Sequence, residues 1–160
     1  MEANPKSVTW DPSYPMWAQA YEWTCSVASV TWVLQSTGTA YTEIDQYTAR
    51  EEVLHALGYP SCVNETYGAM SSTCLQDGLE QYGLESEQAW VTFDQAYAIC
   101  SGTTGLINPV GMYHYMAIRG VTGDSLSVAN SAEGYCGVYS TLSRSQFNAL
   151  GPVQIIAIRP

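Results

Sequence analysis

Basic residues are scarce in this sequence, and their scarcity excludes one class of partner. The chain has 160 residues, of which 5 are Lys or Arg and 15 are Asp or Glu, so its formal net charge is -10. A protein that binds nucleic acid neutralises phosphates with clustered Lys and Arg. No nucleic-acid partner is therefore expected, and the acidic balance also disfavours anionic membrane surfaces.

Long apolar runs, linkers and repeats are missing as well. No apolar stretch approaches the roughly 20 residues that a membrane-spanning helix needs, so no membrane insertion is expected. The first residues, Met1 to Asp11, contain one Lys and no apolar core, and are not a signal peptide. The length fits one domain over residues 1–160. The sequence does not indicate an oligomeric state.

Several signatures of catalytic or metal sites are absent too. There is no Cys-x-x-Cys, and neither histidine lies near a cysteine at a spacing typical of zinc ligands. There is no Gly-x-Ser-x-Gly elbow, no metalloprotease motif and no glycine-rich loop for phosphates. A glycosidase needs paired carboxylates, but acids such as Glu51 and Glu52 are typical of a solvated helix face. We expect no metal and no cofactor.

The cysteine count is odd, which singles out one cysteine. Five are present, and Cys25 stands apart in the sequence from the other four. Those four could form two disulfides or could simply be small buried hydrophobic residues. If bridges exist, the domain works outside the reducing cytosol, with an extracellular or cell-wall setting favoured. The four candidates are Cys62, Cys74, Cys100 and Cys136.

The order of the predicted elements indicates an α+β fold, because helical patterns come first and strand patterns second. Residues 1–17 hold prolines among aromatics and predict an extended N-terminal arm. A central buried helix follows, with Thr24 as its N-cap. The fold expected is a helical first part packed on an antiparallel sheet. Predicted helices are 24–36, 43–57, 67–82 and 93–100; predicted strands are 105–108, 113–121, 125–130, 137–142 and 153–158.

Cys25 is the candidate nucleophile because it lies at the predicted start of the buried helix. Exposed N–H groups and the positive end of the helix dipole favour a thiolate there, so a lowered thiol pKa is expected. The base has to be one of two histidines. His55 lies on the last turn of an amphipathic helix and fits a surface role, whereas His114 opens a predicted strand directly after a turn. We therefore favour His114, although a histidine on an apolar strand is more often a core residue.

Two further polar residues lie where such a pair needs support. Asn130 ends the strand that follows the His114 strand, and a hairpin would bring its amide oxygen to the imidazole. The alternative is that Asn130 only ends the strand. Gln19 lies six residues before Cys25, and its side-chain amide could join the Cys25 backbone N–H as an oxyanion hole. Trp23, Tyr113 and Tyr115 flank these residues and could bind substrate or serve in packing.

Taken in chain order, these motifs resemble those of the papain-like cysteine peptidases. The resemblance is carried by Gln19-x5-Cys25, by His114-Tyr-Met-Ala-Ile-x-Gly-Val, and by Val128-Ala-Asn-Ser-x-x-Gly134. It is greatest to the compact C39-like branch, in which a His strand and a following Asp- or Asn-ended strand lie near the C-terminus. The resemblance implies Cys25 as nucleophile, His114 as general base and acid, Asn130 as orienting group and Gln19 in the oxyanion hole.

Two departures leave the substrate open. Ser26 follows Cys25 where this family frequently has glycine, and the orienting residue is Asn130 where the C39-like branch more often has Asp. The expected function is hydrolysis of a peptide or isopeptide bond through a thioester, on a peptide, a protein or a peptidoglycan peptide. The alternatives are acyl transfer through the same thioester, an inactive papain-like binding module, or a structural α+β protein.

Overall fold

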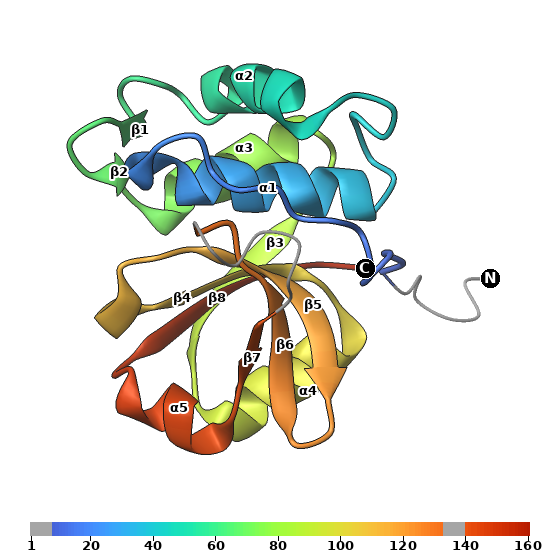
Figure 1. The fold of residues 1–160 in the computed structure, drawn as a ribbon, viewed down its shortest axis with the longest axis vertical. Coiled ribbons are helices and arrows are strands. Elements are labelled where there is room, and N and C mark those ends of the chain that lie inside the picture. The colour runs from blue at the N-terminus through green and yellow to red at the C-terminus, as the bar shows by residue number, and fades with distance from the viewer. Residues whose placement is uncertain (1–7, 133–139) are drawn as a thin grey trace.

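The computed structural model describes residues 8–132 and 140–160, which form a helical layer on a six-stranded antiparallel sheet (Figure 1). This confirms the predicted α+β class. No helix in these two ranges is both long and apolar enough to span a membrane. The helices are η1 (Glu22–Thr24), α1 (Cys25–Ser36), α2 (Gln46–Ala56), α3 (Ser72–Gln81), α4 (Phe93–Gly102), η2 (Val110–Met112) and α5 (Arg144–Ala149). The strands are β1 (Val63–Asn64), β2 (Gly68–Ala69), β3 (Ser86–Val91), β4 (Gly105–Pro109), β5 (Met116–Thr122), β6 (Ser125–Ala129), β7 (Ser140–Leu142) and β8 (Val153–Ile158).

The large sheet has the strand order β3-β8-β4-β5-β6-β7, and all its neighbours are antiparallel. Figure 1 shows α1, α2 and α3 gathered on one side of it, with α4 and α5 packed at its other side. The hairpin of β5 and β6 pairs Ala117 with Ala129, which brings the start of β5 beside the end of β6. This pairing places the residues before β5 next to those after β6.

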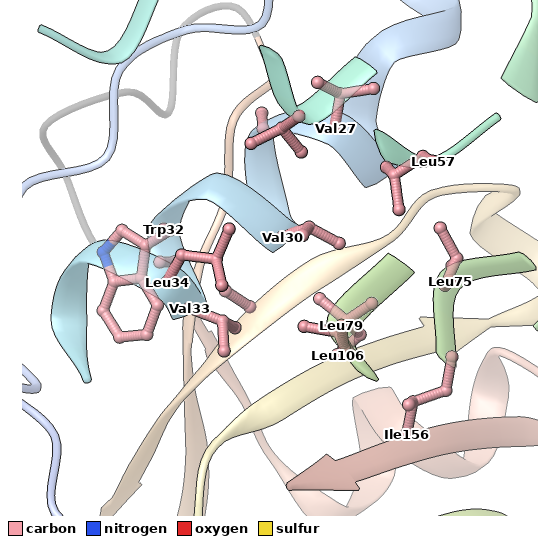
Figure 2. Close-up of a cluster of buried hydrophobic side chains, with 14 of the residues drawn as sticks. Val27, Val30, Trp32, Val33, Leu34, Leu57, Leu75, Leu79, Leu106 and Ile156 are labelled. Atoms are coloured by element: carbon pink, nitrogen blue, oxygen red, sulfur yellow. The ribbon is translucent and has the colours of Figure 1, made fainter. Parts of the chain in front are cut away.

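Helix α1 is the centre of the first hydrophobic core, since all twelve of its residues are buried. It packs against α2, α3 and one face of the sheet, where Leu106 and Ile156 meet it (Figure 2). Most of its hydroxyl and amide groups bond to nearby carbonyls, as the Thr31 hydroxyl does to Val27 O at 2.8 Å, and the buried Ser26 hydroxyl is an exception. Such internal bonds remove the cost of burying polar groups. The position of its first residue, Cys25, is therefore fixed by the core.

A second core lies on the opposite face of the sheet. The strands alternate between the two: Leu106 and Ile156 face α1, while their neighbours Ile107 and Ile155 pack with α4 and α5. This period of two is the expected pattern for a sheet covered on both faces. The sheet is thus held on both sides, which makes it a rigid support for the segments at its edges.

The N-terminal segment from residue 8 crosses the molecule without forming a helix or strand before η1. The indole N–H of Trp10 donates to Arg119 O at 3.0 Å, and that of Trp32 donates to Tyr14 O at 2.8 Å. The buried Arg50 side chain of α2 donates to the carbonyls of residues 17 and 18. These bonds fix the chain immediately before Gln19.

Two predicted elements begin later than expected, and one helix was missed. The helix predicted from residue 67 begins at Ser72, because the Asn64 side chain accepts the N–H groups of Thr66 and Tyr67 and turns the chain into the β1–β2 hairpin. The strand predicted from residue 113 begins at Met116, because η2 precedes it and Tyr113 is left-handed, with φ of 49°. Helix α5 was not predicted at all.

The candidate disulfide cysteines have different outcomes. Cys62, just before β1, and Cys74, in α3, form a bridge, so two of the four candidates are paired. Cys100 is a free, fully buried thiol on α4, and burial raises its pKa to about 12. Cys136 lies outside the described residues, as do residues 1–7 of the predicted arm and 137–139 of a predicted strand.

Candidate active site

The candidate nucleophile Cys25 is at the first residue of α1, where the helix meets the chain leading into β5. The backbone N–H of Tyr115 donates to Cys25 Sγ at 3.4 Å. One turn further along α1, the Ser29 hydroxyl donates to Tyr115 O at 3.1 Å. Both polar backbone groups of Tyr115 therefore bind α1, and they hold the residue after His114 against the thiol.

His114 and Asn130 are joined, as the sequence predicted from their strand positions. His114 Nε2 and Asn130 Oδ1 lie 2.7 Å apart, and the same oxygen accepts the backbone N–H of Ala132 at 2.9 Å. The N–H of Ala132 identifies this atom of Asn130 as the oxygen, so Nε2 must carry the hydrogen between them. In neutral His114 the lone pair is then on Nδ1, which is the nitrogen that can act as a base.

Burial shifts the pKa values of both groups toward their neutral forms. Burial raises the pKa of the Cys25 thiol, and this effect outweighs hydrogen bonds from the backbone N–H groups of Tyr115, Ser26 and Cys25, which lower it. Burial also lowers the pKa of His114, and this effect outweighs the hydrogen bond to Asn130, which raises it. The expectation of a lowered thiol pKa from the helix start alone is therefore wrong for the resting site, because desolvation outweighs the N–H donors. A positively charged group beside the thiol would favour its ionised form.

The start of α1 also differs from the prediction in its capping. The 3-10 turn η1 runs directly into α1, so helical backbone begins one turn before Cys25. The Thr24 hydroxyl makes no cap bond to α1; it donates to Tyr21 O at 2.8 Å and accepts the Tyr21 N–H at 3.1 Å. This arrangement moves the helix start upstream of the thiol and reduces the contribution of free N–H groups.

Gln19 lies close to this site but its amide is engaged elsewhere. Nε2 donates to the carbonyls of Tyr21 and Glu22 at 2.9 and 3.1 Å, and Oε1 accepts the Ser131 hydroxyl at 2.8 Å. The Gln19 N–H also donates to Ser131 O at 2.7 Å. Gln19 therefore links the segment before α1 to the residue after Asn130.

The Cys25 side chain lines a cavity of about 460 Å³ between the helical layer and the sheet. All three predicted substrate-binding residues, Trp23, Tyr113 and Tyr115, line it as well. Tyr113 is 89% exposed and also borders a second cavity, of about 610 Å³, lined by His114 and Asn130. The side chain of Tyr113 thus stands between the space above the thiol and the space beside the imidazole.

One wall of the cavity was missed by the sequence reasoning. The β1–β2 hairpin contributes residues 65–69, closed at its base by the Cys62–Cys74 bridge. Gly68 lies against the chain beside Cys25: a Cβ built on it would be 3.1 Å from Trp23 O. The signal that could have found the hairpin is Asn64 with Gly68 four residues on, a turn pattern that interrupts a helix.

His55 is exposed on α2, packs edge-on to Tyr59 at 6.4 Å between centroids, and does not line the Cys25 cavity. Within residues 8–132 and 140–160 there is no group of three or more His, Cys, Asp or Glu side chains that could hold a metal ion.

Two solved structures share this fold. One is a double glycine motif protease from an AMS/PCAT transporter, in complex with the leader peptide, with 16% identity over 96% of this chain and 94% of that one, and a TM-score of 0.64. The other is the peptidase domain of Streptococcus ComA, a bifunctional ABC transporter of a quorum-sensing pathway, with 13% identity over 91% of this chain and 99% of that one, and a TM-score of 0.66.

These likenesses confirm, at the level of the fold, the C39-like resemblance that the motifs indicated. Both neighbours are peptidases of transporters, and nearly the whole of each is covered by this chain. No protein-family model matches the sequence, and no curated protein sequence matches it either. The identities are low, so the comparison establishes the architecture and leaves the chemistry to the residues.

Proposed function

We propose that this protein is a cysteine peptidase that cleaves peptide bonds with Cys25 as nucleophile, His114 as base and acid, and Asn130 as the orienting residue. The observation that carries the proposal is the backbone bond from Tyr115 to the Cys25 thiol. It keeps Tyr115, the residue after His114, against the Cys25 thiol, in a fold shared with peptidase domains.

The first half of the reaction forms a thioester. His114 Nδ1 takes the Cys25 proton, and the resulting imidazolium compensates the thiolate that burial otherwise disfavours. Sulfur attacks the substrate carbonyl carbon, and the tetrahedral intermediate collapses as His114 passes the proton to the leaving amine. Asn130 holds the imidazole through Nε2 during both transfers, which keeps Nδ1 directed at the reacting atoms.

The second half hydrolyses that thioester. Water gives a proton to His114 Nδ1 and adds to the carbonyl carbon, and sulfur leaves and recovers the proton. The products are an amine and a carboxylic acid, and the enzyme returns to its starting state. Acyl transfer would follow the same first half, with an amine replacing this water.

The oxyanion of each tetrahedral intermediate needs hydrogen-bond donors. The backbone N–H of Cys25 is one, and Gln19 is the proposed second. In the resting site its Nε2 bridges two carbonyls, and the longer bond, 3.1 Å to Glu22 O, is the one that an oxyanion would replace. The Ser131 hydroxyl, bonded to Gln19 Oε1, would hold the amide in place during that exchange.

A peptide is the substrate class that the fold and the cavity favour. One structural neighbour was crystallised with a leader peptide. Here the cavity is open to solvent past the exposed Tyr113 side chain, so an extended chain could pass over the thiol. The Cys62–Cys74 bridge favours action in an oxidising compartment.

Cleavage of a synthetic peptide library, read by mass spectrometry, tests the proposal. Wild-type protein should cleave a subset of peptides, and Cys25→Ala should cleave none. Cys100→Ala is the matched control, since it removes a buried thiol outside the cavity and should keep cleavage. The proposal would be overturned if Cys25→Ala formed products at the wild-type rate, or if the wild-type protein cleaved no peptide in the library. An added peptide amine separates hydrolysis from acyl transfer, because the transfer product carries the mass of the amine.

A further inference from the structure

Helix α1 presents two polar side chains to the segment that carries His114. Cys25 and Ser29 are four residues apart, so they lie on the same face of the helix, one turn from each other. Cys25 Sγ accepts the backbone N–H of Tyr115 at 3.4 Å, and the Ser29 hydroxyl donates to the backbone carbonyl of Tyr115 at 3.1 Å. Adjacent turns of α1 therefore hold one residue of the incoming chain at both of its backbone polar groups.

The segment held in this way lies before the sheet. Strand β5 begins at Met116, which is the first of its residues to pair with β4. Upstream, Tyr113 turns the chain with a left-handed φ of 49°. His114 and Tyr115 lie between this turn and the strand. The β5 ladder therefore does not reach them, and their distance from the thiol depends on their own contacts.

Burial makes the Ser29 hydroxyl hard to replace. Ser29 is 0% exposed, so water does not reach the hydroxyl in the folded protein. Without this hydroxyl, the buried carbonyl of Tyr115 would lose a donor, which is costly. The segment could find another partner for that carbonyl only by moving, and such a movement would also take the Tyr115 N–H away from Cys25 Sγ. A change at Ser29 thus reaches the thiol through a single residue.

We propose that Ser29 is a positioning residue of the reaction, which holds Tyr115 so that the thiol and the imidazole meet. The inference rests on the proposed function, because that function makes the distance between these two groups matter. Ser29 would touch neither the substrate nor the reacting atoms. Its effect would lie in the step in which the thiolate forms and attacks, and not in the binding of the peptide.

Two serine-to-alanine variants of the same helix test the inference. Ser29→Ala removes the hydroxyl that bonds to Tyr115. Ser36→Ala is the matched control, because Ser36 is the last residue of α1, is 5% exposed, and bonds within the helix to Val33 O at 3.2 Å. Each variant loses one buried hydroxyl and gains alanine, which favours helix, so both should fold. Urea unfolding measures the stability that each has lost.

The first readout is the cleavage of one peptide that the wild-type protein cuts. In Ser29→Ala, kcat should fall about tenfold, which is the size expected when a hydrogen bond to a charged group is weakened. KM should stay within about twofold, because the cavity wall is unchanged. Ser36→Ala should keep both constants. This split between kcat and KM separates positioning from a general loss of folded protein.

The second readout is the pH profile of Cys25 alkylation by iodoacetamide, which needs no substrate. Donation from the Tyr115 N–H lowers the pKa of Cys25, so weakening it should raise that pKa. The profile of Ser29→Ala should therefore move about half to one pH unit toward higher pH, and that of Ser36→Ala should coincide with the wild type. His114 and the titratable residues that line the cavity are the same in both variants: Glu22, Glu65, Tyr67, Tyr113 and Tyr115.

Hydrogen exchange of the Tyr115 backbone N–H, followed by NMR, reports the contact itself. It should be about tenfold faster in Ser29→Ala than in the wild type or in Ser36→Ala. Wild-type kcat, alkylation profile and exchange rate in Ser29→Ala would overturn the inference while cleavage by Cys25 stands. An equal fall of kcat in Ser36→Ala would also count against it. If the wild-type protein cut no peptide, the proposed function would fail, and alkylation and exchange would still show whether Ser29 holds Tyr115 against the thiol.

Discussion

Replacing Asn130 with aspartate is the sharpest perturbation of the reacting pair. The substitution keeps the size of the side chain and puts a carboxylate oxygen where Oδ1 now lies, 2.7 Å from His114 Nε2. Burial lowers the pKa of His114, and the Asn130 bond partly offsets that effect. A full negative charge at the same distance stabilises the imidazolium much more than an amide dipole does, so the pKa of His114 should rise.

The size of the rise follows from the distance. Opposite unit charges about 4 Å apart interact by about 4 kcal/mol at an effective dielectric constant of about 20. Burying the new carboxylate cancels part of this, since Asn130 is only 5% exposed. We expect a net rise of about one to two pKa units, or about 1.4 to 3 kcal/mol. Asn130→Ala should act in the opposite direction, because it removes the bond that now raises the pKa.

The assay is NMR titration of the imidazole carbon-bound protons. The chain contains two histidines, so a His55→Gln background leaves a single imidazole signal that belongs to His114. The predicted order of His114 pKa values is Asn130→Ala lowest, wild type intermediate and Asn130→Asp highest. Three coincident titration curves would refute the reasoning, because they would mean that the Nε2–Oδ1 contact does not persist in solution.

Two other predictions concern the cavity wall. Gly68→Ala should raise KM more than it lowers kcat and should destabilise the fold by about 1–2 kcal/mol, because φ of Gly68 is +69° and the new Cβ would lie 3.1 Å from Trp23 O. Gly83→Ala is the control: Gly83 also has a positive φ, but a Cβ there would have no atom within 4 Å, so this variant should lose stability without the change in KM. Replacing Cys62 and Cys74 together with serine should lower the urea unfolding free energy by about 3 kcal/mol for this loop of twelve-residue separation. Unchanged stability would show that the bridge does not form in solution.

The places of the proposed reacting residues in the fold were predictable because they follow simple local patterns. A cysteine at the start of an apolar helix and a histidine before an apolar strand are visible in the sequence. A hairpin then brings Asn130 to His114 through the period and pairing of two adjacent strands. The three aromatics near these residues were predicted to face the substrate, and they line the cavity.

What the sequence did not show depends on contacts between distant segments. Residues 67–69 of the hairpin wall were included in the helix predicted over residues 67–82. The turn at Asn64 depends on hydrogen bonds from backbone N–H groups to its side chain. The raised pKa of Cys25 comes from burial by the whole core, which the helix-start argument omits. The engagement of Gln19 with Ser131 joins residues 112 positions apart, and no local pattern indicates it.

The most direct test of the central claim is the pH dependence of Cys25 alkylation by iodoacetamide, followed site by site with mass spectrometry. If His114 supplies the charge that a buried thiolate needs, wild-type Cys25 should react well below the ordinary thiol pKa of about 8.5. In His114→Ala the reaction should require a higher pH, because burial raises the thiol pKa and no imidazolium is then present to stabilise the thiolate. Superimposable profiles for the two proteins would contradict the account.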